Sequence, residues 1–171
     1  PELYGRIERL SFNPPDSVSL GPDGSADMVV TFRSTHGWIN RGFAQSVYQA
    51  MFAVLKPGGV LGVEQHRGPE GVSAESGYVP EATVIEIAQA AGFVLEARSE
   101  INANPADDHD HPEGVWSLPP TLRGATDEQI TQYRQYLDQQ ATYRLSLYDL
   151  AGLPNITQDA VSLDQQQLAP N

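Results

Sequence analysis

The side chains best suited to chemistry follow two short apolar runs. Arg33 and His36 come after Met28–Phe32, and His66 comes after Val60–Val63. The imidazole pKa is ordinarily near neutrality, so His36 is the candidate general base and His66 its acid–base partner. A guanidinium can hold a carboxylate or phosphate through two hydrogen bonds, which is the catalytic role predicted for Arg33.

Further polar and aromatic residues near these positions are candidates for contact with a small-molecule substrate. Each candidate also has a structural interpretation: a loop histidine can bond to the backbone, an arginine can pair with a local acid, and tryptophan or tyrosine can pack in a core. The sequence leaves both interpretations open. The predicted substrate-contacting residues are Trp38, Glu64, Arg67, Tyr78, Asn102 and Asn104.

The elements that must position these residues form one strand–helix–strand unit. Met28–Phe32 is a continuous apolar run typical of a buried strand. Apolar residues at helical spacing predict a helix from Arg41 to Leu55, which Pro57-Gly58-Gly59 would end before the strand Val60–Val63. Such a unit is a right-handed parallel crossover, and ligands bind at the carboxyl ends of its strands.

The rest of the chain predicts a helix, a hairpin and a terminal helix. Pro80–Ala91 has a helical stripe, and Phe93–Ile101 alternates like a strand with one solvated face. Val115–Leu118 could pair with that strand in an antiparallel hairpin. An amphipathic helix capped by Thr126 is expected over 126–151, with an apolar stripe at Ile130, Tyr133, Leu137, Ala141, Leu145 and Tyr148.

The composition of the chain disfavours several classes of binding partner. The net charge of −12 disfavours nucleic acid and anionic membranes, and no apolar run could span a bilayer. The absence of cysteine fits a reducing compartment, and with no targeting segment we expect a cytoplasmic protein. Because the chain starts at Pro1, we expect it to begin inside a longer gene product.

The run Asp107–His111 holds three carboxylates and two imidazoles, a donor set that suits divalent cations. A metal-binding module centred on His109 and His111 is therefore a third interpretation. Its spacing matches no closed structural metal site, and local clusters of this kind are commonly solvated loops. We therefore assign no metal from the sequence.

Several motifs in order resemble those of a known family. Asp23–Val30 leads into the first apolar run, and Leu55-Lys-Pro-Gly-Gly-Val-Leu61 leads into the second. Thr31–Trp38, Glu100–Pro105 and Gly114–Leu122 follow the same order. Across roughly residues 20–123 the pattern resembles the carboxyl-terminal part of class I S-adenosylmethionine-dependent methyltransferases, within a bacterial subfamily of predicted methyltransferases.

The resemblance implies an α/β fold with a partial Rossmann-like sheet. This sheet would be mostly parallel with an antiparallel terminal hairpin, over residues 1–123, and residues 124–171 would form a C-terminal helix and tail. It also implies methyl transfer from S-adenosylmethionine to a small molecule. The family's Gly-x-Gly loop after its first strand is not recognisable here, so we expect the chain alone to bind this cofactor weakly or not at all.

Two functions therefore stand side by side. The chain is either the substrate-side half of a methyltransferase or a catalytically inactive, methyltransferase-like interaction module. In the second case it would form a homodimer or bind a missing amino-terminal half, because a sheet without its first strands has an uncovered edge.

Overall fold

A computed structural model of the chain describes residues 4–103, 107–119 and 121–131. The chain divides into two compact units, residues 1–95 and residues 96–171, and each is considered by itself. Within the described ranges, no helix has both the length and the apolar character needed to cross a membrane.

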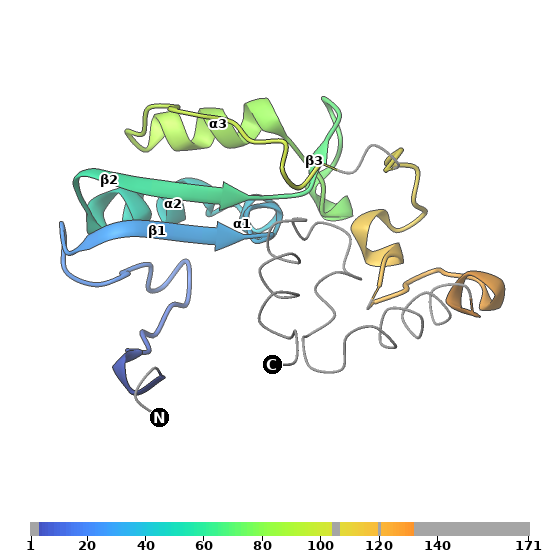
Figure 1. Ribbon diagram of the computed structural model, residues 1–171, viewed down its shortest axis with the longest axis horizontal. Helices are drawn as coiled ribbons and strands as arrows, with labels where there is room; N and C mark the ends of the chain where they lie inside the picture. Colours follow the sequence, from blue (N-terminus) through green and yellow to red (C-terminus); the bar gives the residue numbers. More distant parts are fainter. Residues whose placement is uncertain (1–3, 104–106, 120, 132–171) are drawn as a thin grey trace, which may run out of the picture. The chain divides into compact units, whose positions relative to one another are not determined.

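The first unit is built on two parallel strands, β1 (Ala26–Phe32) and β2 (Leu55–Glu64). The register places Val30 beside Gly62 and Phe32 beside Glu64. Figure 1 shows the two strands running in the same direction, so their carboxyl ends meet at one edge. The predicted parallel α/β arrangement is confirmed at this level.

The second strand begins earlier than the sequence predicts. Leu55 is already extended and pairs with Ala26, and Val60 next pairs with Met28. The Pro57-Gly58-Gly59 turn therefore lies within the paired region, where it produces an irregular register, and does not separate the helix from the strand. A side chain on Gly59 would meet the Lys56 carbonyl oxygen at 2.9 Å, so this close approach requires glycine.

The segment between the strands holds two helices where the sequence predicted one helix from Arg41 to Leu55. They are α1 (Thr35–Asn40) and α2 (Ala44–Val54). Gly42 has a φ of 77°, a left-handed conformation that glycine adopts without strain, and it lies between the two helices. The missed helix α1 matters because it contains His36 and Trp38.

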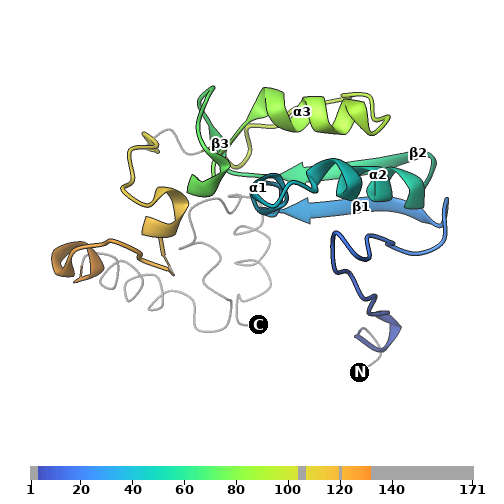
Figure 2. The same cartoon turned by 180° about the vertical axis from the view of Figure 1, so that it is seen from behind.

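The helices cover one face of the sheet. The core cluster Phe43, Val47 and Met51 packs against Val29 and Leu61 of the strands. Figures 1 and 2 show α1 and α2 on the same side of β1 and β2, seen from opposite directions.

The other face of the sheet is open. Met28, Val30 and Phe32 are 62%, 53% and 63% exposed, and Val60 is 44% exposed. Within the described residues the sheet has two strands, so the outer edge of β1 has no strand partner there. Met28, Val30, Phe32 and Val60 are called the open apolar face below.

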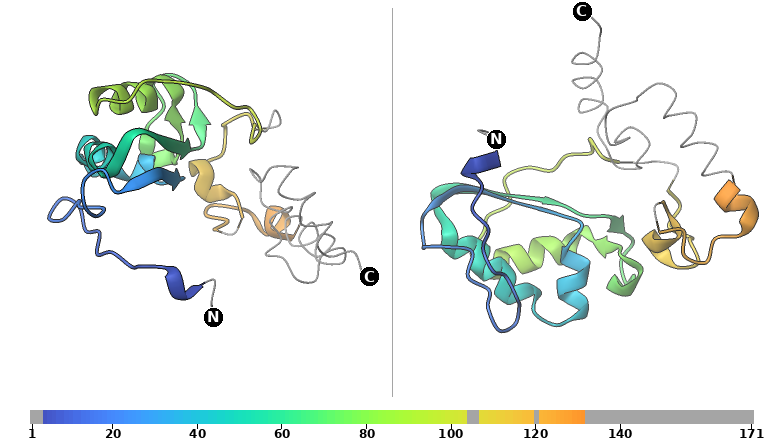
Figure 3. Two further views of the ribbon diagram at one scale, coloured as in Figure 1. Left: turned by 60° about the vertical axis from the view of Figure 1, so that its left-hand side comes forward. Right: turned by 90° about the horizontal axis from the view of Figure 1, so that it is seen from below.

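After β2 the chain makes a short second strand pair and a third helix. β3 (Arg67–Gly68) is parallel to β4 (Val79–Pro80), and the 3₁₀ turn η2 (Ala74–Ser76) lies between them. The helix predicted over Pro80–Ala91 is confirmed as α3 (Glu81–Ala90). The rings of Phe52 in α2 and Phe93 meet edge to face at 5.1 Å, which places α3 on the helical side of the sheet (Figure 3).

The predicted terminal hairpin is wrong. Residues 93–101 are not a strand, and Val94 is 88% exposed. In the expected partner, Val115–Leu118, the first three residues lie in the 3₁₀ turn η3 (Gly114–Ser117), and Leu118 follows directly after it. Alternation permits a strand but does not form one, because the backbone groups still need a paired neighbour.

The predicted cap at Thr126 is confirmed. The Gln129 amide N–H donates to Thr126 Oγ1 at 3.2 Å, and the Thr126 amide N–H donates to Gln129 Oε1 at 2.9 Å. This reciprocal capping box begins a helix over 127–131. The remainder of the helix predicted over 126–151, and the tail beyond it, lie outside the described residues.

The core cluster gives a direct stability prediction. Met51 is 4% exposed, so Met51→Ala should lower the free energy of unfolding by about 2–5 kcal/mol through lost burial and a cavity. Gln49→Ala, on the exposed side of the same helix, should change it by less than about 0.5 kcal/mol. Urea unfolding followed by circular dichroism measures both, and equal effects would contradict this packing of α2.

Candidate functional site

Arg33 and Glu64 meet where the two long strands end. The Arg33 amide N–H donates to the Glu64 carbonyl oxygen at 2.8 Å, and Arg33 has a φ of 50°, which is uncommon for a residue other than glycine. Burial raises the pKa of the Glu64 carboxyl, while the positive charge of Arg33 acts in the opposite direction. The carboxyl ends of β1 and β2, where Arg33 and Glu64 meet, are called the rim below. The rim combines a cation with a carboxyl group that gains a proton more readily than usual.

His36 lies on the helical side of the same rim and is 9% exposed. Its Nδ1 is 3.3 Å from Gln65 Nε2. Gln65 Nε2 also donates to the Gly77 carbonyl oxygen at 2.8 Å. Burial lowers the pKa of His36, and the positive charge of Arg41 adds to this effect, whereas the side-chain contact with Gln65 acts in the opposite direction. His36 is therefore predominantly neutral near pH 7.

Helix α1 is fixed by a buried contact next to His36. The hydroxyls of Thr35 and Tyr48 share a hydrogen bond at 2.8 Å, and both residues are fully buried. Trp38 packs edge to face against Tyr48 and Phe12, with ring centroids at 6.2 and 6.5 Å. Trp38 thus follows the core-packing interpretation that the sequence left open.

The remaining candidates after β2 are occupied by structural contacts. The ring of His66 meets that of Tyr78 edge to face at 6.1 Å, and Tyr78 is 1% exposed. Arg67 forms a partly exposed ion pair with Glu81 at 3.2 Å. A buried ring must move before a ligand can reach it, so Tyr78 packs in this structure.

The structure therefore brings some of the predicted site residues together and places others elsewhere. It brings Arg33, Glu64, His36 and Gln65 to the ends of the two long strands, with His66 one residue further along. Asn102 belongs to the second unit, where its Oδ1 is buried without a hydrogen-bond partner among the described residues. Asn104 lies outside the described residues.

Sequence reasoning gave Gln65 no role of its own, although a signal for one existed. Leu61 faces the helices, and successive strand side chains alternate between faces. Continuing this alternation past the strand end places Gln65 on the side of α1 and Glu64 on the opposite side. The missing information was that a helix begins at Thr35, directly across from it.

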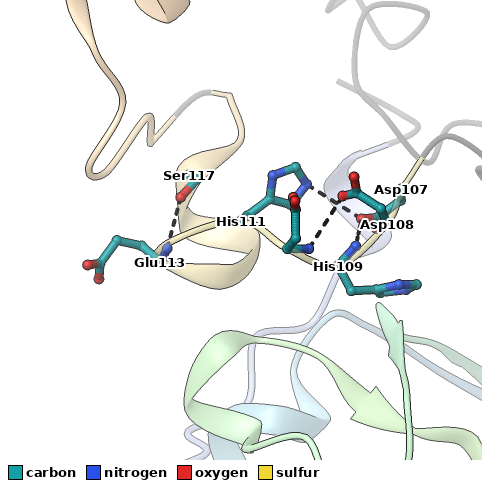
Figure 4. Close-up of polar contacts among 7 residues, drawn as sticks. Asp107, Asp108, His109, His111, Glu113 and Ser117 are labelled. Atoms are coloured by element: carbon teal, nitrogen blue, oxygen red, sulfur yellow. Dashed lines mark hydrogen bonds and ion pairs between the residues drawn. The ribbon is translucent and has the colours of Figure 1, made fainter.

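The acidic loop of the second unit brings three possible ligands together. Ligand atoms of Asp107, Asp108 and His111 lie within 4.8 Å of one another, and His111 Nε2 is 3.5 Å from Asp107 Oδ1. Figure 4 shows the His109 side chain extending away from them, so this residue is not part of the group. The interpretation of a metal site centred on both His109 and His111 is therefore wrong for His109.

The same carboxylates also shape the local turn. Asp107 Oδ1 accepts the His109 amide N–H at 3.0 Å, and Asp108 Oδ1 accepts that of Asp110 at 3.4 Å (Figure 4). A hydrogen bond between the carboxyl groups lowers the pKa of Asp108 and raises that of Asp110. These backbone contacts account for the convergence, and we assign no metal to it.

The rim does not by itself fit S-adenosylmethionine. Adenosyl cofactors are bound where a glycine-rich turn lets the backbone approach them at the start of a helix. Here the turn from β1 into α1 is Arg33-Ser34, and a guanidinium at this position repels a cationic sulfonium. The turn between β1 and α1 therefore contains no glycine that would let the backbone approach such a cofactor.

No protein-family model matches this chain, and neither a curated protein nor a solved structure matches it.

The lowered pKa of His36 predicts a pH dependence of stability. Below its ordinary pKa of 6.5 the unfolded chain takes up a proton that the folded chain resists. The stability that the folded chain gains from keeping His36 neutral is therefore fully present above pH 6.5. It is lost as pH falls through the pKa of His36 in the folded state, which lies below 6.5.

Chemical unfolding from about pH 8 to about pH 5 tests this dependence. His36→Gln should lose less stability than the unmodified chain over this range. Arg41→Gln should show an intermediate loss, because it removes one cause of the lowered pKa. Identical pH profiles for all three proteins would refute the assignment.

Proposed function

We propose that this chain supplies the substrate-side part of an S-adenosylmethionine-dependent methyltransferase acting on a small molecule. The observation that carries the proposal is the polar rim at the carboxyl ends of β1 and β2. In open α/β sheets this edge is where ligands bind. The order of motifs along residues 20–123 provides the reaction class through its resemblance to the family.

The residues of the rim suit an acceptor that carries a proton and a negatively charged group. Arg33 would hold the anionic group, and it is close enough to Glu64 to affect the pKa of that carboxyl. Glu64 would accept the proton, since a carboxylate with a raised pKa is the stronger base.

The open apolar face supports the view that the domain is shared with another polypeptide segment. A doubly wound sheet is covered by helices on both faces, whereas here α1, α2 and α3 are all on one. In this proposal the cofactor-binding residues reside in a partner layer that covers Met28, Val30, Phe32 and Val60.

The proposal predicts weak cofactor binding by the chain alone. Isothermal titration of the 171-residue chain with S-adenosylmethionine should give no saturable binding at micromolar concentrations. A protein that also contains the family's glycine-rich cofactor loop should bind it. Tight binding by the 171 residues alone would contradict the proposal that the cofactor-binding residues lie outside this chain.

A second candidate function is an interaction module without catalysis. The open apolar face and the outer edge of β1 favour it, because exposed strand edges pair with other chains. In that case Arg33 and Glu64 would be structural, and their replacement would leave any methyl transfer by an assembled enzyme unchanged.

Association through this face is directly testable. If it is an interface, Val30→Lys should shift the mass measured by size-exclusion chromatography with light scattering toward the monomer, because a charge would be buried in the contact. Ala53→Lys, at an exposed position of α2, serves as the matched control. A monomer for the unmodified chain at all concentrations would exclude self-association.

A further inference from the structure

The side chain of Gln65 links three separate segments at the rim. Its Nε2 is 2.8 Å from the Gly77 carbonyl oxygen and 3.3 Å from His36 Nδ1. Gln65 directly follows β2, His36 lies in α1, and Gly77 precedes β4. One amide group therefore connects three places in the chain: the end of β2, the start of α1 and the segment that precedes β4.

The partners determine which way the amide faces. The Gly77 carbonyl can only accept, so the nitrogen end of Gln65 must face it, and the reversed amide would place two oxygens together. Oε1 is buried and has no hydrogen-bond partner within the described part of the chain. An amide held only through its nitrogen end is unusual, since buried polar atoms are generally satisfied.

The amide nitrogen carries two hydrogens, and the two contacts use both. One hydrogen is donated to Gly77, which leaves the other for the 3.3 Å contact with His36 Nδ1. A neutral imidazole has one protonated and one bare nitrogen, so Nδ1 must be the bare one here. The proton of neutral His36 is then on Nε2.

We propose that Gln65 is a positioning residue that holds neutral His36 in the tautomer protonated at Nε2. This inference rests on the proposed function for its catalytic meaning. It changes the role of His36 from general base to hydrogen-bond donor through Nε2.

Replacing Gln65 should change which imidazole nitrogen of His36 carries the proton. In Gln65→Glu the carboxylate has no hydrogen to donate and accepts one from Nδ1, so Nε2 becomes bare. Gln65→Leu removes both contacts with little change in size, so neither nitrogen should be favoured by position 65. Gln49→Glu adds the same charge at an exposed position of α2 and is the matched control.

Nuclear magnetic resonance of the ¹⁵N-labelled 171-residue chain reads the tautomer directly from the imidazole nitrogen shifts. His36→Asn identifies which signals belong to His36. Above the pKa of His36, the unmodified chain and Gln49→Glu should show Nε2–H in excess over Nδ1–H by about tenfold, the population ratio of a one-unit difference in site pKa. Gln65→Glu should invert this ratio, and Gln65→Leu should lower it toward the smaller excess of Nε2–H that an unconstrained neutral imidazole has.

An excess of Nδ1–H in the unmodified chain would overturn the inference without any variant. An unchanged ratio in folded Gln65→Glu would also overturn it. The measurement uses neither cofactor nor substrate, so its outcome is independent of the titration with S-adenosylmethionine. A correct tautomer with no methyl transfer would remove the proposed function and leave the pairing of Gln65 with His36 intact.

Discussion

The parallel register of β1 and β2 determines the position of every candidate group in the first unit. Because Phe32 lies beside Glu64, the chain leaves both strands at the same edge, and Arg33 bonds to the Glu64 backbone there. A shift of one residue would exchange the two faces of either strand. The core contacts of Val29 and Leu61 with α2 oppose such a shift, since it would expose them.

The two faces of the strand pair produce different chemistry at the rim. On the helical side, the buried Thr35–Tyr48 bond fixes α1 and brings His36 against Gln65. On the other side, Glu64 ends a row of exposed apolar residues and lies near Arg33. Burial lowers the pKa of the imidazole, and burial beside a cation still raises that of the carboxyl.

Several candidate site residues make structural contacts in the first unit. Trp38, Tyr78 and Arg67 lie near the strand ends, but they pack in the core or form an ion pair. Residue type indicates what a side chain can do, whereas its partners decide what it does. Tryptophan and tyrosine serve equally in cores and in binding sites, so the sequence could not separate these roles.

The sequence by itself determined the parallel crossover, helix α3 and the Thr126 cap, because apolar periodicity and capping chemistry act between residues close in the chain. Only the tertiary structure decided the break at Gly42, the failed hairpin at 93–101 and the pairing of Gln65 with His36. Each of these depends on which distant backbone or side chain comes within hydrogen-bonding distance. Short-range patterns do not contain that information, because it arises when the helices pack on the strands.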